Sequence, residues 1–465
     1  MINKKYIVKS GSVIISAVIL FTGCVKFQRV SLNPSQLYNQ FNSRSLNCSE
    51  LKIFVEQNTG RTNIDWPIKE WNFEDLAIAG LYFNPALETA RLSVKSAESA
   101  IITAGARPNP SISPLGAINR TALGQEGVNP WLPAVDIAVP IETANKRKLR
   151  IAVATNRVEI AKLNLVSAAW QVRANIRNIW IELLSAQSRS NILQSQIKLL
   201  EKIKSSMESQ LDAGEIKATD VTPSIIAIAS AQIELSSAIR QFNESLPQLA
   251  SAIGVPLEAV KNINILLKFN YDTNLLNYFL STNAIETALK TRPDILAQLY
   301  EYEAAQSALQ LEIAKQYPDI VIGPGYEFDQ GEHKWKLGLT VDLPIFNRNQ
   351  GPIAEALANR NLAAAKFNEI QIKAISEMEE AIVSANTAIE ELRRFQTLQQ
   401  IKEKHLQDLE AQLKSGVIDA LVLEHARVDL FSIEKPLIEA YINWEKAIAK
   451  LESAFYRPLN LLNIK

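Results

Sequence analysis

Cysteine is nearly absent from this sequence, because Cys24 and Cys48 are the only two in 465 residues. If the chain is exported to an oxidising compartment, it has to be held together by packing rather than by intrachain disulfide bonds. Histidine is also rare, with three residues, and none belongs to a recognisable catalytic pair or metal-ligand pattern. We therefore expect a protein that is not an enzyme and that has no cofactor and no metal site.

Neither sign of charge is in excess, because 49 basic residues balance 49 acidic ones. Without a basic stripe, the chain gives no support for nucleic-acid binding. Beyond the N-terminal segment, no apolar run approaches the ~18–20 residues that a membrane helix needs. If the chain crosses a membrane, it must use β-strands, because only helices and closed barrels satisfy every backbone group in lipid.

The N-terminus resembles a bacterial lipoprotein signal peptide. Three lysines precede an apolar stretch over residues 11–21, and "LFTGC" (20–24) resembles the lipobox. The resemblance predicts cleavage before Cys24 and acylation of this cysteine, with palmitate as the expected lipid. Val25 follows the cysteine and favours the outer membrane. The alternative is an ordinary secretory signal in which the cysteine is incidental.

Glycine and proline are few, with 16 and 19 residues, and two long stretches at 141–213 and 353–415 contain neither. At ~1.5 Å per residue, these stretches predict helices of about 95–110 Å, too long for a compact domain. Apolar residues at heptad-like spacing predict coiled-coil packing. Gly214 and Gly416 are expected to end the long helices, and Asp220 is the expected N-cap of the first return helix. The sequence therefore predicts two antiparallel helical hairpins.

Two stretches between the helices alternate with the two-residue period of a β-strand. They are "WLPAVDIAVPI" (131–141) and "WKLGLTVDLPI" (335–345), and each places apolar side chains on one face. Shorter extended segments are expected before them, at 110–119 and 318–328. The turn-rich segments "RTALGQEGVNP" and "DQGEHK" are expected to be the connecting loops.

These elements occur twice, as a tandem duplication with a period near 200 residues. Trp131 matches Trp335 at an offset of about 204, and "SQLDAGEIKATDV" (209–221) matches "AQLKSGVIDALVL" (411–423) at nearly the same offset. Each half begins with a helix, expected at 85–106 and 284–316. The expected divisions are a signal peptide (1–23), an irregular lipid-anchored strap (24–75), a first repeat (76–260), a linker (261–283), a second repeat (284–458) and a tail (459–465).

Four strands of about ten residues, each with an apolar and a polar face, suit the wall of a transmembrane barrel. Trp131 and Trp335 are the expected members of an interfacial aromatic girdle. Four strands cannot close a barrel, so several chains have to contribute. The alternative is a small water-soluble sheet that caps a helical domain.

The layout resembles the outer-membrane efflux protein (TolC-like) family over about residues 70–458. The matching segments are "LDAGEIKATDV", "LKSGVIDALVLEHARVDL" and "LGLTVDLPIFNRNQGPIAEA" (337–356), and the similarity is greatest to the heavy-metal efflux branch. The resemblance implies a mostly α fold, in which long antiparallel hairpins form a periplasmic tunnel and four transmembrane strands per chain complete a 12-stranded barrel in a homotrimer. It also implies a periplasmic adaptor and an inner-membrane pump of the RND type as partners.

The hairpin tips are the expected docking surface for the adaptor, although simple helix capping also explains their composition. Their small and apolar residues are Ala213, Gly214, Ile216, Ser415, Gly416, Val417 and Ile418. The resemblance further implies an acidic ring that forms a gate near the tip of the second hairpin. The family's acidic positions are occupied here by Val422 and His425, so Asp419 or Glu424 is the expected ring residue.

We interpret the chain as a passive outer-membrane channel of a tripartite efflux system, with heavy-metal cations as the favoured cargo. The first alternative is a lipid-anchored periplasmic scaffold whose hairpins bind partners without forming a pore. The second is the outer-membrane duct of a type I secretion system.

Overall fold

The computed structural model describes residues 25–60, 65–123, 129–269, 279 and 283–458. The predicted signal peptide, Cys24 and the tail lie outside the described residues. The chain divides into two compact units, Met1–Arg44 and Ser45–Lys465. In the first unit, Asn33 caps α2 (Pro34–Asn42) by accepting hydrogen bonds from the backbone amides of Ser35 and Gln36.

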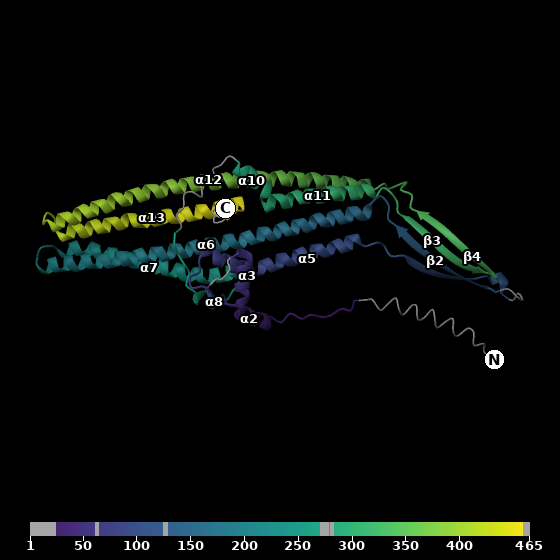
Figure 1. The fold of residues 1–465 in the computed structure, drawn as a ribbon, viewed down its shortest axis with the longest axis horizontal. Helices are drawn as coiled ribbons and strands as arrows, with labels where there is room; N and C mark the ends of the chain where they lie inside the picture. The colour runs from purple at the N-terminus through teal and green to yellow at the C-terminus, as the bar shows by residue number, and fades with distance from the viewer. Residues whose placement is uncertain (1–24, 61–64, 124–128, 270–278, 280–282, 459–465) are drawn as a thin grey trace. The chain divides into compact units, whose positions relative to one another are not determined.

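The second unit is mostly helical, and Figure 1 shows its long helices running side by side from a small sheet. Its helices are α3 (Ser49–Thr59), α4 (Phe73–Phe83), α5 (Pro85–Gly105), α6 (Lys146–Asp212), α7 (Ala218–Ile253), α8 (Leu257–Lys261), α10 (Ala284–Thr291), α11 (Pro293–Ala314), α12 (Gln350–Lys414) and α13 (Ala420–Phe455). Its strands are β1 (Ser111–Ile118), β2 (Trp131–Ile141), β3 (Ile320–Asp329) and β4 (Glu332–Val341), and a short 3-10 helix, η1 (Arg120–Ala122), follows β1. No described helix is long and apolar enough to cross a membrane.

The two predicted hairpins are confirmed. Helix α6 has 67 residues and α12 has 65, so each is about 100 Å long. Gly214 and Gly416 follow them with φ of 78° and 74°, a left-handed conformation that suits glycine. Helices α7 and α13 then run back along α6 and α12 (Figure 1).

The start of the first return helix differs from the prediction that Asp220 is its N-cap. Helix α7 begins at Ala218, with Lys217 as the N-cap residue. Asp220 is the third residue of the helix, and its carboxylate accepts a hydrogen bond from the backbone amide of Lys217 at 2.9 Å. An acidic residue at this position satisfies an amide that the helix itself leaves unpaired.

The prediction of one continuous helix over 284–316 is wrong, because the chain breaks between α10 and α11. Arg292 is extended, with φ −62° and ψ 127°, and Pro293 is the first residue of α11. A residue before proline is driven out of the helical region, whereas proline itself is well suited to the first helical position.

The segment expected to be an irregular strap contains the helices α2 and α3, and its second part packs into the core. Trp71 is fully buried, and its backbone pairs with Asn264 and Leu266 through two hydrogen bonds of 2.8 Å. Leu51 and Phe73 are also buried in the same cluster, which includes residues of α6 and α7. The apolar residues of this segment therefore complete the core of the first half.

The four strands form one antiparallel sheet in the order β1-β2-β3-β4. Two strands from different halves, β2 and β3, pair at its centre. The second hairpin has a two-residue turn at Gln330 and Gly331, both with positive φ, where a longer loop was expected. The last strand covers Glu332–Val341 instead of the predicted 335–345.

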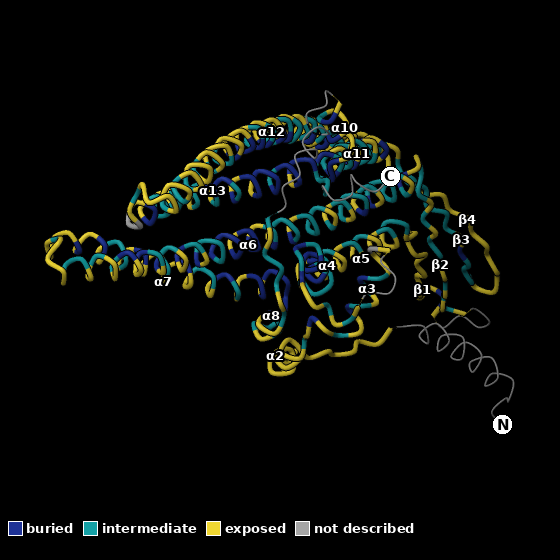
Figure 2. Tube along the Cα trace, turned by 60° about the vertical axis from the view of Figure 1, so that its left-hand side comes forward, coloured by how far each residue is buried: buried dark blue, intermediate teal, exposed yellow. Residues whose placement is uncertain are grey.

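The core lies in the middle of the helices. One cluster joins α3, α4, α6 and α7, and a second joins α10, α12 and α13. Figure 2 shows the buried positions on the facing sides of these helices and the exposed positions at the hairpin turns. The sheet and the turns are thus the exposed parts that this core supports.

Candidate functional site: the sheet and the hairpin turns

The pairing register places most of the large apolar side chains of the four strands on one face of the sheet. Directly paired residues project to the same side, so Ile118↔Trp131 and Tyr326↔Trp335 belong to one face. The same face contains Ile112, Val135, Val139, Ile141, Ile320, Ile322, Leu337, Leu339 and Val341. Several of its members are strongly exposed, Trp335 by 82%. A large continuous apolar surface of this kind is typical of a site that contacts lipid or another chain.

The opposite face carries the charged side chains of the sheet, together with Leu115, Leu132 and Val321. Asp136 lies opposite Gly325, where a larger residue would meet its carboxylate. Glu327 forms an ion pair with Lys336 across β3 and β4. Near the turn, Lys334 forms a further pair with Asp329 at 2.5 Å. All these charged side chains therefore lie on the face opposite the tryptophans, as the sequence alternation predicted.

The two tryptophans of the predicted girdle lie towards the loop end of the sheet. Trp131 pairs with the last residue of β1, and Trp335 lies four residues after the turn of the second hairpin. The Trp335 ring also packs against Tyr326, with 5.1 Å between ring centroids. Both tryptophans are exposed on the apolar face, and their place in a membrane girdle stays a prediction.

The two hairpin turns are built alike. In the first, the Glu215 amide donates to the Gln210 carbonyl at 2.9 Å, and in the second the Val417 amide donates to Gln412 at 3.0 Å. These bonds, with glycine in the left-handed region, are those of a Schellman motif. Ala213, Gly214, Ser415, Gly416 and Val417 are exposed, and Ile216 and Ile418 are half-buried. The predicted docking residues thus form accessible surfaces at both turns, and their role stays a prediction.

The two candidate ring residues have different environments. Asp419 is exposed, and its side chain makes no capping hydrogen bond to α13. Glu424 is buried, and its Oε1 accepts hydrogen bonds from Lys202 Nζ at 2.5 Å and from Arg427 Nη1 at 3.2 Å. Arg427 also pairs with Glu410 at 3.0 Å. The hydrogen bond between Glu424 and Lys202 therefore links the second hairpin to the first. The charge of Glu424 is compensated by the side chains of Lys202 and Arg427.

A charged cluster that the sequence interpretation missed lies in the middle of the second unit. Arg173 forms two hydrogen bonds to Glu74, of 2.6 and 2.7 Å, and Arg177 pairs with Glu445 and Glu452. These contacts join α4, α6 and α13. The only local signal is a pair of arginines one turn apart in a mostly apolar part of α6.

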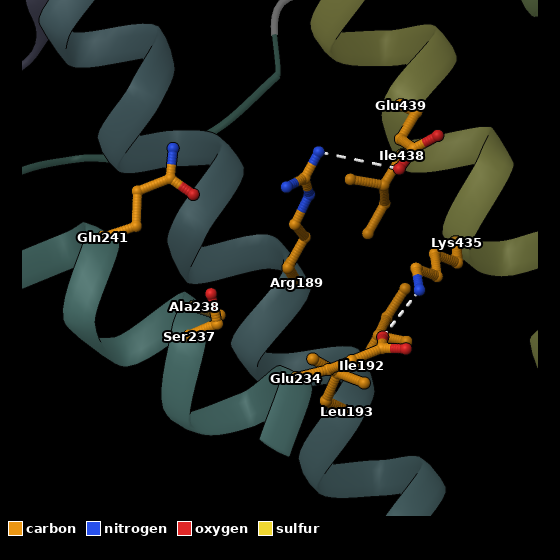
Figure 3. A pocket seen from close by; sticks show the side chains of 10 residues that line it. All are labelled: Arg189, Ile192, Leu193, Glu234, Ser237, Ala238, Gln241, Lys435, Ile438 and Glu439. Carbon is orange, nitrogen blue, oxygen red and sulfur yellow. Dashed lines mark hydrogen bonds and ion pairs between the residues drawn. The ribbon is translucent and has the colours of Figure 1, made fainter. Parts of the chain in front are cut away.

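A cavity of about 260 Å³ lies between α6, α7 and α13 (Figure 3). Two ion pairs border it, Lys435–Glu234 at 2.6 Å and Arg189–Glu439 at 3.6 Å, and Figure 3 shows both bridging from α13 to the first hairpin. No group of three or more His, Cys, Asp or Glu side chains that could hold a metal ion is present among the described residues. Among the described residues, the candidate functional features are therefore the apolar face of the sheet, the two hairpin turns and the ion pairs between helices.

A model of the family described as outer membrane efflux protein matches residues 81–255 and 284–455. The chain therefore belongs to the outer membrane efflux protein family, and each match falls on one half of the duplication. Its family and its structural relatives are channels rather than enzymes.

Among relatives, the cobalt-zinc-cadmium resistance protein CzcC of Cupriavidus metallidurans is 24% identical over 294 residues, which cover 62% of this chain and 66% of that protein. The outer membrane protein OprJ of Pseudomonas aeruginosa is 25% identical over 174 residues, covering 35% of this chain and 36% of OprJ. The match thus spans just under two thirds of CzcC and just over a third of OprJ.

Solved structures share the fold over most of the chain. The outer membrane protein VceC of Vibrio cholerae has a TM-score of 0.67 at 18% identity and covers 83% of this chain and 96% of its own. CusC, whose structures concern transmembrane channel formation, has a TM-score of 0.66 at 14% identity. The match covers 93% of this chain and 99% of CusC. The mostly α fold with long hairpins and a small sheet is therefore that of outer membrane channels.

Proposed function

We propose that this chain is one third of a passive outer-membrane duct in a tripartite efflux system. The observation that carries the proposal is the continuous exposed apolar face of the sheet, which suits hydrocarbon better than water. Its outer strands, β1 and β4, have no further partner among the described strands. A transmembrane sheet has to close on itself, and three chains with four strands each supply the twelve strands of the predicted barrel.

The helical hairpins extend this barrel into the periplasm as a tunnel. The long helix of each hairpin is about 100 Å long. The exposed turns of the hairpins bind a periplasmic adaptor, which connects to an inner-membrane pump of the RND type. For the acidic ring, the exposed Asp419 is the better candidate, because Glu424 is buried and paired with Lys202 and Arg427. Acylation of Cys24 anchors the N-terminus to outer-membrane lipid in this proposal.

Heavy-metal cations are the favoured cargo, and the likeness to a cobalt-zinc-cadmium resistance protein supports this choice. A wide duct does not need to bind what it conducts, so the proposal requires no metal site in this chain. The scaffold alternative requires the apolar face of the sheet to be covered by something other than lipid. The type I secretion alternative keeps the duct and changes only its cargo.

An arginine scan of the two faces tests the proposal. Leu339→Arg places a charge on the apolar face, where a position near the bilayer midplane costs roughly 2–4 kcal/mol. We expect loss of the heat-resistant oligomer and of single-channel conductance. Thr340→Arg is the matched control, because Thr340 is the next residue in the strand and projects from the opposite face. This variant should keep the heat-resistant oligomer and the single-channel conductance. Equal behaviour of the two variants, together with an oligomer that needs no detergent, would contradict a membrane duct.

A further inference from the structure

The start of α6 contains a cluster of cations that the second half of the chain lacks. Residues 145–150 read "NKRKLR", shortly after the end of β2, whereas the counterpart segment, 349–354, reads "NQGPIA". The two segments begin with the same backbone, because Asn145 and Asn349 precede α6 and α12 with φ of 59° and 63°. The fold of this junction therefore forms without cations, and those of the first half need a separate explanation.

Two of these cations are used within the chain. Lys146 Nζ donates to Asp319 Oδ1 at 2.7 Å and to the Tyr317 carbonyl at 2.6 Å. Arg150 pairs with both carboxylate oxygens of Glu142, with 3.1 Å between Nη2 and Oε2. These contacts attach the start of α6 to the base of the sheet, and they compensate the charges of both side chains.

Three neighbouring cations, Arg107, Arg147 and Lys148, have no acidic partner among the described residues. Arg147 is held in place, because its Nε donates to the carbonyl of Gly105, the last residue of α5, at 2.6 Å. Arg107 and Lys148 are exposed. Since like charges repel one another, an anion that binds beside all three would be stabilised by each of them.

The three cations line one cavity of about 630 Å³ at the base of the sheet, where α5 and α6 approach the strands (Figure 1). Val139 and Ile141 line the same cavity and belong to the apolar face of the sheet. Pairing between β1 and β2 stops at Ser111↔Ala138, so the last residues of β2 have no partner on the β1 side. The cavity therefore combines a basic lining from the start of α6 with an apolar lining from the end of β2.

The acidic lining of this cavity is already neutralised. Glu142 is the one carboxylate among the described residues that line it, and Arg150 pairs with this group. The cavity thus offers no uncompensated acceptor to the ammonium group of a zwitterionic lipid. Its chemistry fits a molecule with a negative charge joined to a hydrocarbon chain.

We propose that this cavity binds the headgroup phosphate of an anionic phospholipid, with an acyl chain along Val139 and Ile141. The inference rests on the proposed function, which places the apolar face in hydrocarbon and the cations that follow it at the bilayer surface. Basic residues beside a membrane-spanning segment attract anionic headgroups, and a guanidinium such as that of Arg147 matches the geometry of phosphate oxygens. The site belongs to the leaflet from which the helical tunnel extends.

Three probes test the site on the purified wild-type oligomer in detergent. Native mass spectrometry of the oligomer titrated with phosphatidylglycerol should show one tightly bound lipid per chain. Phosphatidylcholine with the same acyl chains isolates the headgroup charge and should bind at least tenfold more weakly. Inorganic phosphate distinguishes a free anion from a lipid, and at equal concentration it should not displace phosphatidylglycerol.

Arg107→Gln with Lys148→Gln removes two exposed cations from the cavity. We expect this double variant to bind phosphatidylglycerol at least tenfold more weakly and phosphatidylcholine as the wild-type chain does. Lys95→Gln with Lys198→Gln is the matched control, because it removes the same charge from exposed positions of α5 and α6 away from the cavity. The control variant should retain the wild-type affinity for both lipids.

Four results would overturn the site. Equal affinity of the wild-type oligomer for the two lipids would show that headgroup charge is not recognised. Unchanged binding in the Arg107/Lys148 variant would exclude these cations, and an equal loss in the control variant would show general attraction between charges. Displacement of the lipid by an equal concentration of inorganic phosphate would identify a site for free anions instead.

Single-channel conductance separates this inference from the proposed function. The Arg107/Lys148 variant should still form the conducting, heat-resistant oligomer, so that its loss of lipid is not a loss of folding. A conducting wild-type oligomer that retains no phosphatidylglycerol would reject the site and leave the duct intact. A chain that binds the lipid as expected but neither conducts nor requires detergent would instead reject the duct.

Discussion

Arg177 on α6 donates a hydrogen bond to Glu452 on α13 at 2.7 Å, although 275 residues separate them in the sequence. The same guanidinium lies 3.3 Å from Glu445, and both carboxylates are buried. Both contacts require the return helix of the second hairpin to lie against the long helix of the first. These ion pairs therefore join the two halves of the duplication to each other.

Arg177→Ala should destabilise the protein, because it leaves buried carboxylates with less compensating charge. The loss of one partner of a buried pair costs about 3–5 kcal/mol. We expect a clear fall in the urea midpoint of the protein in detergent. Lys435→Ala is the control, because the Lys435–Glu234 pair is exposed and should contribute roughly 1 kcal/mol or less. Similar falls for both variants would show that the Arg177 cluster has no special role.

The long hairpins could be predicted from the sequence because their signals are local. The absence of glycine and proline over some sixty residues or more leaves few alternatives to helix, and Gly214 and Gly416 supply the left-handed residues that end them. The two-residue alternation similarly reveals strands and their faces. The order of elements and the face of each strand follow from such local patterns.

Features that depend on distant partners could not be predicted. No local pattern shows that Glu424 accepts hydrogen bonds from Lys202, 222 residues away, so both acidic candidates for the ring looked equivalent. The boundary of β4 likewise depends on which strand lies beside it.

The break at Arg292, by contrast, could have been predicted from the sequence, because an internal proline such as Pro293 disfavours helix at the residue before it.

Gly254→Ala should destabilise the first half. Gly254 ends α7 with φ 93°, and an added Cβ would lie 2.6 Å from the backbone oxygen of Phe83. Left-handed strain and this clash with backbone together cost roughly 1–3 kcal/mol. The expected result is a lower melting temperature by circular dichroism. Gly351→Ala is the matched control, because its Cβ would meet nothing and alanine favours helix. If Gly351→Ala lowered the melting temperature as much as Gly254→Ala, this explanation would be contradicted.

Glu434→Gln should stabilise the second hairpin at neutral pH. Burial raises the pKa of Glu434 above its ordinary value, and the nearby Glu403 carboxylate raises it further. Since the folded state binds this proton more tightly than the unfolded chain, the contribution is most favourable below the unfolded pKa near 4.3 and is lost as pH rises through the folded pKa. The variant should therefore gain most at pH 7 and least at pH 4, as measured by thermal unfolding.

Glu403→Gln provides the matched comparison for this effect, because it removes the second carboxylate instead of the first. The double variant should gain less than the sum of the two single variants, since either change relieves the same repulsion. A gain at pH 4 as large as that at pH 7 would contradict a charge effect.

Asp419→Asn should reduce the cation preference of the channel, if the exposed acid at the start of α13 forms the charged ring. Three such carboxylates in a trimer attract cations, and their neutralisation should shift the reversal potential in a salt gradient towards zero. Glu424→Gln is the comparison. Its carboxylate is buried beside Lys202 and Arg427, so its neutralisation should weaken the tie between hairpins and leave selectivity largely unchanged. If Glu424→Gln instead produced the larger shift in reversal potential, then Lys202 and Arg427 would have to release it in the conducting state, and Asp419 would lose its role.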